Sequence, residues 1–564
     1  MRSPVSVAAP ALSLLVACSS LSLGAGCGGA TPPPATPPSQ PPPTPPASVT
    51  APPPSTPPPA AKADPFATPA NLRREAPPSL PTQSPEDEIA ARAEKTAGVR
   101  APDATCAVYT KRAVAAPEAS CKDGPAARAA LEKALAIADA AKRDAALGAL
   151  EACKGLPRGF VRGLRAELAP AACGDVLVKD ERKNLASYDP VVAHALVGYF
   201  VAGRLARTPS APPAMTGAAT RERVQAFVSG PFKQWFADQA RALEELSNVG
   251  VKLGFYGRAV VAVEAGLAEI RFVETVRAAP IPAAWQADPE LRVVYYGALD
   301  QMLEPRKARM RDALLVGLRD MAAVGVIRDA RVDRARAGLS GLYAGRRIDA
   351  LDGLMLGDDD AAGGGLFAAL PTFYAGLLLS PDEAKDPRVV PQLARRGLPW
   401  SLRLGLASAP IADKGQRAAY ARARLDLGRT HWRAADYDAA LGLLLEDAAA
   451  LDEPSRLVAA AALALREGPD DAHAMMNAAS PSALNLRKVD ALDAVAGGKG
   501  EVAGRADYDA ALLALLSPPE GAGKAHFTAL AERFRRAASK LVKPDEKKRA
   551  EEAAARAEAT ARAL

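Results

Sequence analysis

A proline-rich run from Thr31 to about Pro65 sets the first limit on what this chain can fold into. Its residues are nearly all Pro, Ala, Thr and Ser, and proline fixes φ and removes a backbone donor, so the run cannot form a helix or bury a core. We expect extended polyproline II structure at ~3.1 Å per residue, a semi-rigid spacer on the order of 100 Å long. A ligand for an SH3-type domain is the weaker interpretation. The sequence therefore predicts a disordered proline-rich tether over residues 18–83.

A short apolar segment precedes this run and ends in Leu15-Val16-Ala17-Cys18. Its apolar core, residues 5–17, follows the basic Arg2, contains Pro10 and is too short to span a bilayer. These features are typical of a cleaved export signal, which we place over residues 1–17.

The order Leu-x-Ala-Cys resembles the lipobox of bacterial lipoproteins. The resemblance implies that Cys18 becomes the acylated first residue of the mature chain, and several acyl chains bury enough methylene to hold a soluble domain at a membrane. Cys27 is the alternative lipidation site, although Gly24 fits the pattern poorly, and a plain secretory signal is the third interpretation. All three interpretations predict that the protein is exported. Lipidation implies a place in the cell envelope, at the outer membrane and facing the periplasm or the cell surface.

Composition favours an all-α fold for the rest of the 564 residues. Hydrophobic residues make up 49% of the chain but aromatic ones only 5%, and an alanine-rich apolar content suits closely packed helices better than strands. Amphipathic segments of roughly ten to twenty residues, separated by Gly or Pro, predict an α-helical body over residues 186–410. A charged helix is expected over residues 544–564.

The net charge of +7, from 71 basic and 64 acidic residues, is small for this length. Nucleic-acid binding needs basic residues concentrated in a stripe with stacking aromatics among them. The sequence therefore predicts no nucleic-acid partner.

Four further cysteines predict two disulfides in an exported protein: Cys106, Cys121, Cys153 and Cys173. We expect them to hold a small helical domain over residues 84–185. Two short helices, over about 125–140 and 143–153, would form a hairpin that returns Cys153 to Cys121. That hairpin favours a nested pattern, with Cys106 and Cys173 paired outside it, while the sequential pairing stays open.

A seven-residue sequence occurs twice near the C-terminus. Ala435-Asp436-Tyr437-Asp438-Ala439-Ala440-Leu441 is repeated identically over residues 506–512, at an offset of 71 residues. That offset is close to twice the ~34 residues of a tetratricopeptide repeat. With Leu427, Gly428 and Trp432 upstream and Pro454 downstream, the first copy resembles the tetratricopeptide pattern.

This resemblance implies a helical-hairpin solenoid, a TPR-like superhelix, over residues 411–543. In the family pattern, Leu-Gly packs the first helix of a pair, Asp-Tyr turns the chain, and a small residue, here Ala440, lets the two helices approach. His431 departs from the pattern, because the family favours tyrosine there. The residues that the resemblance assigns to repeat packing are Leu427, Gly428, Trp432, Tyr437, Ala440, Tyr508 and Ala511.

No residue set in the sequence identifies a reaction. The histidines stand far apart, without a His-x-x-x-His or His-Glu partner: His194, His431, His473 and His526. No phosphate-binding loop, dinucleotide fingerprint or G-x-S-x-G elbow occurs, and the cysteine spacing does not suit zinc. We therefore expect no catalytic residue, no metal site and no cofactor.

The function hypothesis that follows is a membrane-anchored, non-catalytic scaffold that presents a helical-repeat groove to an envelope protein. The alternative is a helical glycan-acting hydrolase or lyase. It requires that buried acids such as Glu264, Glu269 and Glu274 converge on a cavity about 5 to 10 Å apart.

Anchoring can be tested at the cysteine itself. Replacing Cys18 with serine is expected to release the protein from the membrane fraction and to abolish labelling by a palmitate analogue, because the thiol that carries the lipid is gone. Cys27→Ser is the matched control and should keep both properties. Labelling that survives in Cys18→Ser and disappears in Cys27→Ser would contradict the assignment.

Overall fold

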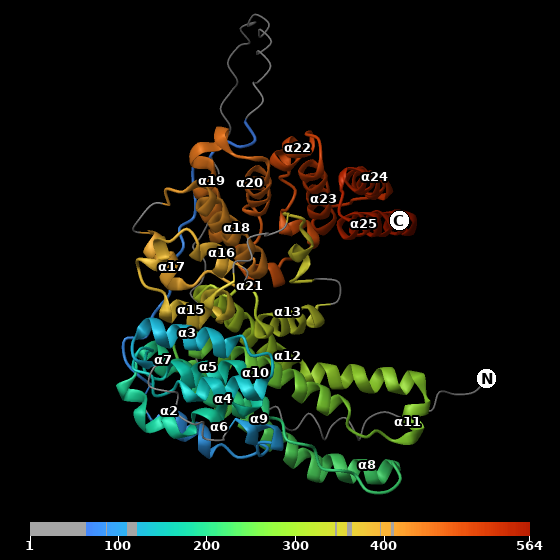
Figure 1. The fold of residues 1–564 in the computed structure, drawn as a ribbon. Coiled ribbons are helices and arrows are strands. Elements are labelled where there is room, and N and C mark those ends of the chain that lie inside the picture. The colour runs from blue at the N-terminus through green and yellow to red at the C-terminus, as the bar shows by residue number, and fades with distance from the viewer. Residues whose placement is uncertain are drawn as a thin grey trace, which may run out of the picture. The chain divides into compact units, whose positions relative to one another are not determined.

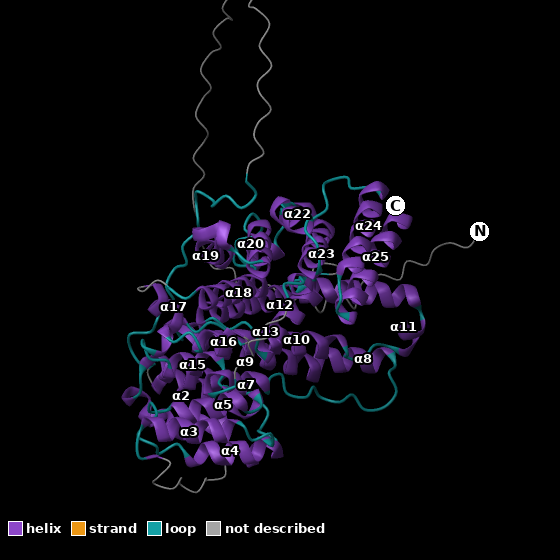
Figure 2. Ribbon diagram, turned by 45° about the horizontal axis from the view of Figure 1, so that its top comes forward, coloured by secondary structure: helices purple, strands orange, loops and turns teal. Residues whose placement is uncertain are grey.

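The computed structural model describes residues 64–85, 87–109, 121–343, 347–357, 364–394, 396–407 and 411–564. Over these ranges the chain is helical and contains no strand, which confirms the all-α expectation (Figure 2). The signal, Cys18, Cys27 and the proline run before Asp64 lie outside the described residues. None of the described helices is long and apolar enough to cross a membrane.

Short helices build the region of the cysteines. They are α2 (Asp87–Lys95), α3 (Gly124–Leu135), α4 (Ala140–Ala149), α5 (Phe160–Leu168) and α6 (Gly174–Val178), with 3₁₀ helices at Ala104–Val108, Ala171–Cys173 and Lys179–Ser187. Asp123 and Asp139 cap α3 and α4, because each side chain accepts a backbone N–H of the first turn. Helix α3 packs against α4, and α4 packs against α5.

The two disulfides have the nested pattern. Cys121 is bonded to Cys153 with a Cα separation of 4.9 Å, and Cys106 is bonded to Cys173 with a Cα separation of 5.2 Å. The pair α3 and α4 lies between the two cysteines of the inner bridge, so the helical hairpin brings them together. The outer bridge then ties the start of this region to its end.

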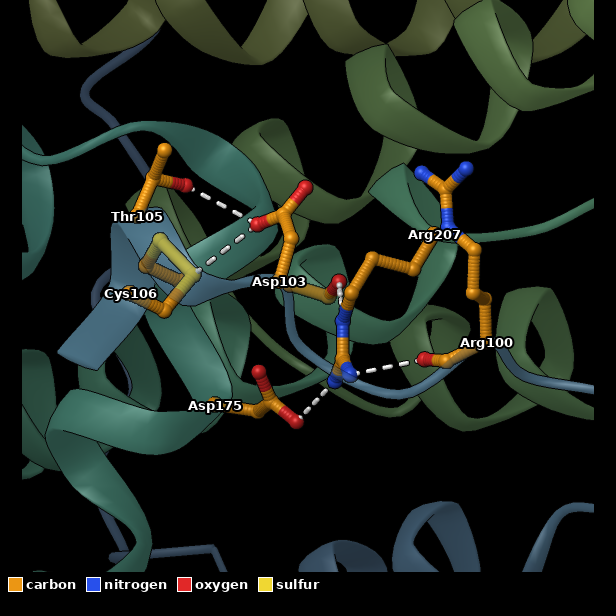
Figure 3. Close-up of a disulfide and its surroundings, with 8 residues drawn as sticks. Arg100, Asp103, Thr105, Cys106, Asp175 and Arg207 are labelled. Atoms are coloured by element: carbon orange, nitrogen blue, oxygen red, sulfur yellow. Dashed lines mark hydrogen bonds and ion pairs between the residues drawn. A yellow bond between two sulfur atoms is a disulfide. The ribbon is translucent and has the colours of Figure 1, made fainter.

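Charged groups surround the outer disulfide (Figure 3). Asp103, beside Cys106, accepts a hydrogen bond of 2.9 Å from the Thr105 hydroxyl. Arg207 donates to the Arg100 carbonyl at 2.8 Å and forms a buried ion pair with Asp175. The bridge and these contacts join the segment before Cys106 to the helices that follow it.

Two nearly completely buried helices form the centre of the body: α7 (Pro190–Ala206) and α10 (Phe255–Arg277). They approach closely at Gly198 and Gly257, where a Cβ on Gly198 would lie 2.7 Å from the Gly257 Cα. Helix α10 also packs against α9 (Lys233–Val251), α12 (Pro289–Val324) and α13 (Ala330–Leu342) (Figure 1).

The rest of the body is made of short elements. The helices are α8 (Arg221–Phe227), α11 (Ala283–Ala287), α14 (Leu366–Ala369), α15 (Thr372–Leu378), α16 (Val389–Ala394) and α17 (Trp400–Ala407), with a π-helical turn at Val228–Phe232 and 3₁₀ helices at Ala350–Gly353 and Glu383–Lys385.

The C-terminal part is a series of helices, most of which pack on near neighbours along the chain, while α18 and α21 also contact α12. Helix α18 contacts α19 and α20, α20 contacts α22 and α23, and α23 contacts α24 and α25. The members are α18 (Lys414–His431), α19 (Ala434–Leu444), α20 (Glu453–Leu465), α21 (Ala472–Met476), α22 (Asp490–Ala496), α23 (Glu501–Leu516), α24 (Lys524–Lys540) and α25 (Pro544–Ala563), with 3₁₀ helices at Leu445–Ala450 and Pro481–Leu484.

The hydrophobic core does not follow the expected domain boundaries. One cluster of buried residues extends from Phe66 to Leu513 and crosses the boundaries expected at residues 185 and 410. A second, alanine-rich cluster joins α23, α24 and α25, and α25 is the charged helix expected at the C-terminus. Residues Pro65–Leu564 therefore form one compact unit.

Candidate binding surface for extended segments

Residues 65–84, which we expected in the disordered tether, lie on the folded body, and we call this segment the strap. In Figure 1 it is the blue trace that begins near α19 and continues past α17. The expectation was wrong for this part because the composition changes after Asp64. Phe66, Leu72 and Glu75 are residue types that the sequence of residues 31–63 does not contain, and in the strap they make apolar and charged contacts.

Burial along the strap repeats every third residue. Phe66 is buried, and the half-buried residues follow at intervals of three: Pro69, Leu72, Glu75, Pro78, Pro81 and Ser84. The other residues from 65 to 83 are exposed. A polyproline II helix has ~3 residues per turn, so this period is the one expected when a single edge of such a helix faces the body.

Glu75 holds the strap at the junction of three helices. Its carboxylate pairs with Arg424 of α18 at 2.7 Å, with Arg433 at 3.1 Å, and with Arg403 of α17. The side chains of Arg403 and Arg424 are almost completely buried. Burial alone would raise the pKa of Glu75, but the attraction of Arg403, Arg424 and Arg433 outweighs it and lowers that pKa to about 2. Glu75 is therefore ionised at any physiological pH.

The arginines around Glu75 also bind the end of α12. Arg433 donates to the Ala322 carbonyl at 3.1 Å, and Arg403 donates to the carbonyl of Ala323. These carbonyls lie in the last turn of α12, and the Ala322 carbonyl also accepts the backbone N–H of Gly325, which caps the helix. Glu75 pairs with both of these cations, and Asp436 adds a second negative charge beside Arg433.

Asp438, in the first copy of the repeated sequence, binds the main chain of the strap. Its buried carboxylate accepts the backbone N–H of Arg73 at 2.8 Å and pairs with Arg466 at 2.8 Å. Arg466 in turn donates to the carbonyl of Asn71 at 2.8 Å. The pair of Asp438 and Arg466 therefore recognises one N–H and one C=O of the extended segment.

Phe66, Thr68 and Leu72 make the remaining contacts of the strap with the body. Phe66 is 6% exposed, and the guanidinium of Arg456 lies 4.9 Å from the centre of its ring. Thr68 donates its hydroxyl to the Leu445 carbonyl at 3.4 Å. Leu72 packs against the hydrophobic core beside Gly442, where a Cβ would be 3.6 Å from the leucine.

The second copy of the repeated sequence binds main chain in the same way. Asp509, the counterpart of Asp438, accepts the backbone N–H of Met355 at 2.6 Å. Met355 belongs to the non-helical segment 354–357, whose Leu356 carbonyl accepts a hydrogen bond of 2.6 Å from Arg422. In both copies, the second aspartate of the Asp-Tyr-Asp motif therefore accepts an N–H from a non-helical segment that is distant in sequence.

The first aspartate of each motif pairs with arginines. Asp436 lies 3.0 Å from Arg424 and 3.2 Å from Arg433, and Asp507 lies 2.8 Å from Arg533 and 2.7 Å from Arg536. Asp436 therefore belongs to the charge cluster around Glu75, whereas Asp507 ties α23 to α24.

The residues assigned to repeat packing are buried. A Cβ on Gly428 would lie 2.5 Å from the Tyr437 ring, so only glycine allows α18 and α19 to pack as they do. Ala440 and Ala511 are completely buried, while Ala439 is half-buried. Leu427 is buried, and Tyr508 packs edge-on against Phe534 at 5.3 Å.

The chain turns between α18 and α19, before Asp436 and Tyr437, the residues at which the resemblance places the turn. Helix α18 ends at His431 and α19 begins at Ala434, so Asp436 lies in the first turn of α19. The turn is made by Trp432, whose φ of 58° is left-handed and whose indole N–H donates to the Ile348 carbonyl at 2.6 Å. In the second copy the motif lies inside α23, where no turn occurs.

The acids expected for a glycan-acting enzyme do not meet. Glu264 and Glu269 are buried in ion pairs with Arg271 at 3.1 Å and Arg306 at 2.9 Å, and Glu274 is exposed. All three lie on α10, and none lines the cavities of about 90, 420 and 800 Å³ in the described part of the body.

The sequence analysis missed Glu167, which lines the smallest of these cavities. Its carboxylate accepts hydrogen bonds from Tyr199 at 2.7 Å and Tyr256 at 2.8 Å and pairs with Arg331 at 2.6 Å. These three donors satisfy the buried Glu167 carboxylate, so its role is structural. No local sequence pattern could have brought these four residues together.

Two of the histidines have structural roles. His194 accepts the N–H of Gly254 and bonds to the Gln83 carbonyl, and burial lowers its pKa. His431 bonds to the Val326 carbonyl at 2.7 Å, and burial lowers its pKa to about 3. Among the described residues, no group of three or more potential ligands could hold a metal ion.

Comparisons of this chain with family models, with curated proteins and with solved structures find no match.

We expect replacement by asparagine to change the stability of the chain in opposite directions at Asp509 and at Asp438. Burial raises the pKa of Asp509 to about 7, although the Met355 N–H and the charges of Arg429 and Arg422 lower it. Between about pH 4 and pH 7 the folded state then holds a proton that the unfolded state releases, so the free energy of unfolding falls as pH rises, by up to about 1.4 kcal/mol per pH unit. Asp509→Asn should remove this slope and stabilise the chain at pH 8.

Asp438→Asn is the matched control. It removes a charge paired with Arg466 and Arg73, so it should destabilise the chain at pH 8. Thermal unfolding from pH 4 to pH 8 would compare both variants with the wild type. Equal destabilisation by both substitutions at pH 8 would contradict the described environment of Asp509.

Proposed function

We propose that this chain is a lipid-anchored scaffold of the bacterial cell envelope, and that its C-terminal helical repeats bind extended segments of partner proteins without catalysis. One observation carries the proposal. The same residue of an identical motif, Asp438 in one copy and Asp509 in the other, accepts a main-chain N–H of a non-helical segment. Main-chain recognition of this kind suits polypeptide ligands of varied sequence.

A tetratricopeptide-like solenoid is the architecture that we propose for residues 411–543. It is supported by the contacts of α18 with α19, of α22 with α23 and of α23 with α24, since successive helices of a solenoid pack on one another, although α18 and α21 also contact α12. The close contact of Gly428 with Tyr437 and the complete burial of Ala440 also support it, because both allow adjacent helices to approach.

Anchoring through Cys18 and a tether up to Asp64 are the parts of the proposal that rest on sequence alone. A lipid at Cys18 followed by an extended proline-rich segment would place the repeats away from the membrane. At that position the partners within reach are other envelope proteins.

The glycan-acting enzyme remains the alternative, and the acids named for it give it no support. A glycosidase needs two carboxyl groups about 5 to 10 Å apart across a substrate site. Glu264 and Glu269 are each neutralised by an arginine on the described body, and Glu274 lies on the surface.

Site-specific photocrosslinking in intact envelopes tests the proposal. A photoreactive amino acid would replace Glu446 or Asp470, whose side chains are 74% and 73% exposed beside the strap. Both positions are expected to capture the same envelope protein. The control position is Val251, which is 72% exposed at the end of α9 and should not capture it.

Two outcomes would overturn the proposal. One is the absence of any protein adduct at Glu446 and Asp470. The other is release of soluble fragments from isolated peptidoglycan by the purified chain, which would favour the enzyme.

A further inference from the structure

We propose that the surface under the strap is a recognition site for polyproline II segments, that the strap is its resident ligand, and that a proline-rich partner segment with leucine and glutamate three residues apart takes the strap's place. The replacement in trans rests on the proposed scaffold function. The recognition site itself rests only on the contacts of the strap.

The three-residue period is the first argument. Each turn of the strap presents one residue to the body, from Phe66 to Ser84, and leaves the two others exposed. A polyproline II helix makes no hydrogen bonds within itself, so its main-chain groups are available to a receptor. Asp438 and Arg466 use them, one binding the N–H of Arg73 and the other the C=O of Asn71.

Two subsites give the surface its specificity. The first takes an aliphatic side chain, Leu72, against the core beside Gly442. The second takes a carboxylate three residues later, where Glu75 meets Arg403, Arg424 and Arg433. An uncharged residue in the second subsite would remove the ion-pair partner of Arg403 and leave Arg424 and Arg433 with Asp436 alone.

The strap is suited to exchange because little of it is buried. Phe66 is its one fully buried residue before Pro85, and the remaining contacts are half-buried side chains, main-chain hydrogen bonds and ion pairs. Polyproline II segments also lose little conformational entropy on binding, because they are extended beforehand. A competing segment with the same contacts could therefore replace the strap without rearranging the core.

The tether itself does not have the required residues. Residues 31–63 contain prolines throughout but no aspartate, glutamate, leucine or phenylalanine. A peptide from this range therefore has the proline content without either subsite residue, and it serves as the matched control ligand.

Fluorescence anisotropy with labelled peptides tests the proposal on the full-length mature chain. The probes are a peptide of residues 64–80, the same peptide with Glu75→Ala, and a tether peptide of residues 31–47. The receptors are the wild type and a Leu72→Asp, Glu75→Ala variant, in which the strap no longer fits its subsites. The variant should bind the first peptide at least tenfold more tightly than the wild type does, and at least tenfold more tightly than it binds the other two peptides.

A second receptor avoids any loss of folding in that variant. Replacing the mostly exposed residues 79–82 with a protease site keeps every contact of residues 66–78, and cleavage then makes the strap a separate peptide. Peptide 64–80 should displace the cut strap, and the tether peptide should not.

The proposal is overturned if neither receptor binds peptide 64–80, if the three peptides bind equally, or if the wild type binds as tightly as the variant. These outcomes concern peptides only. They are distinct from a failure to find an envelope partner by photocrosslinking, which would overturn the scaffold function instead.

Discussion

The ion cluster around Glu75 is the constraint on which the arrangement of the described body depends. Arg403 lies on α17, Arg424 on α18 and Arg433 just after α18, and each directs a donor at this single carboxylate. Three cations this close would repel one another in a medium of low polarity. Together with Asp436, Glu75 therefore lets α17, α18 and the end of α12 meet, and Glu75 does so from a segment that the composition would assign to a tether.

The repeated sequence adds a second level of order. In each copy the first aspartate pairs with arginines, and the second accepts a main-chain N–H. The copies differ in their surroundings, since Asp438 also has Arg466 whereas Asp509 is buried with one oxygen unpaired. One short motif thus holds two non-helical segments, with an arginine paired to the aspartate in the first copy and with the pKa of the aspartate raised by burial in the second.

Much of the helical framework could be predicted from local patterns. Alanine content indicated helices, and the two short helical segments between Cys121 and Cys153 indicated a hairpin that favoured the nested bridges over the sequential ones. The repeated motif indicated the burial of Ala440 and Ala511. These features depend on residues close in sequence. The partners of Glu75 and Glu167 are hundreds of residues away in several cases, and no local pattern predicts such contacts.

The strap was assigned wrongly because proline content outweighed its pattern. Phe66, Leu72 and Glu75 stand at multiples of three, and this spacing was the available signal. A strand or an α-helix would have shown periods of two or 3.6, which are the periods that sequence analysis usually seeks. A polyproline II edge against a folded domain has a period that such a search does not detect.

A double-mutant cycle between Glu75 and Arg424 tests the central claim most directly. The free energy of unfolding would be measured for Glu75→Ala, Arg424→Ala and the double variant, with Glu75→Ala and Arg388→Ala as a control pair, because Arg388 is exposed and paired with Asp386 instead. The account predicts a coupling of at least about 2 kcal/mol between Glu75 and Arg424, and additivity within about 0.5 kcal/mol for the control pair. Additive effects of Glu75→Ala and Arg424→Ala would contradict the claim that this ion cluster holds the strap and the helices together.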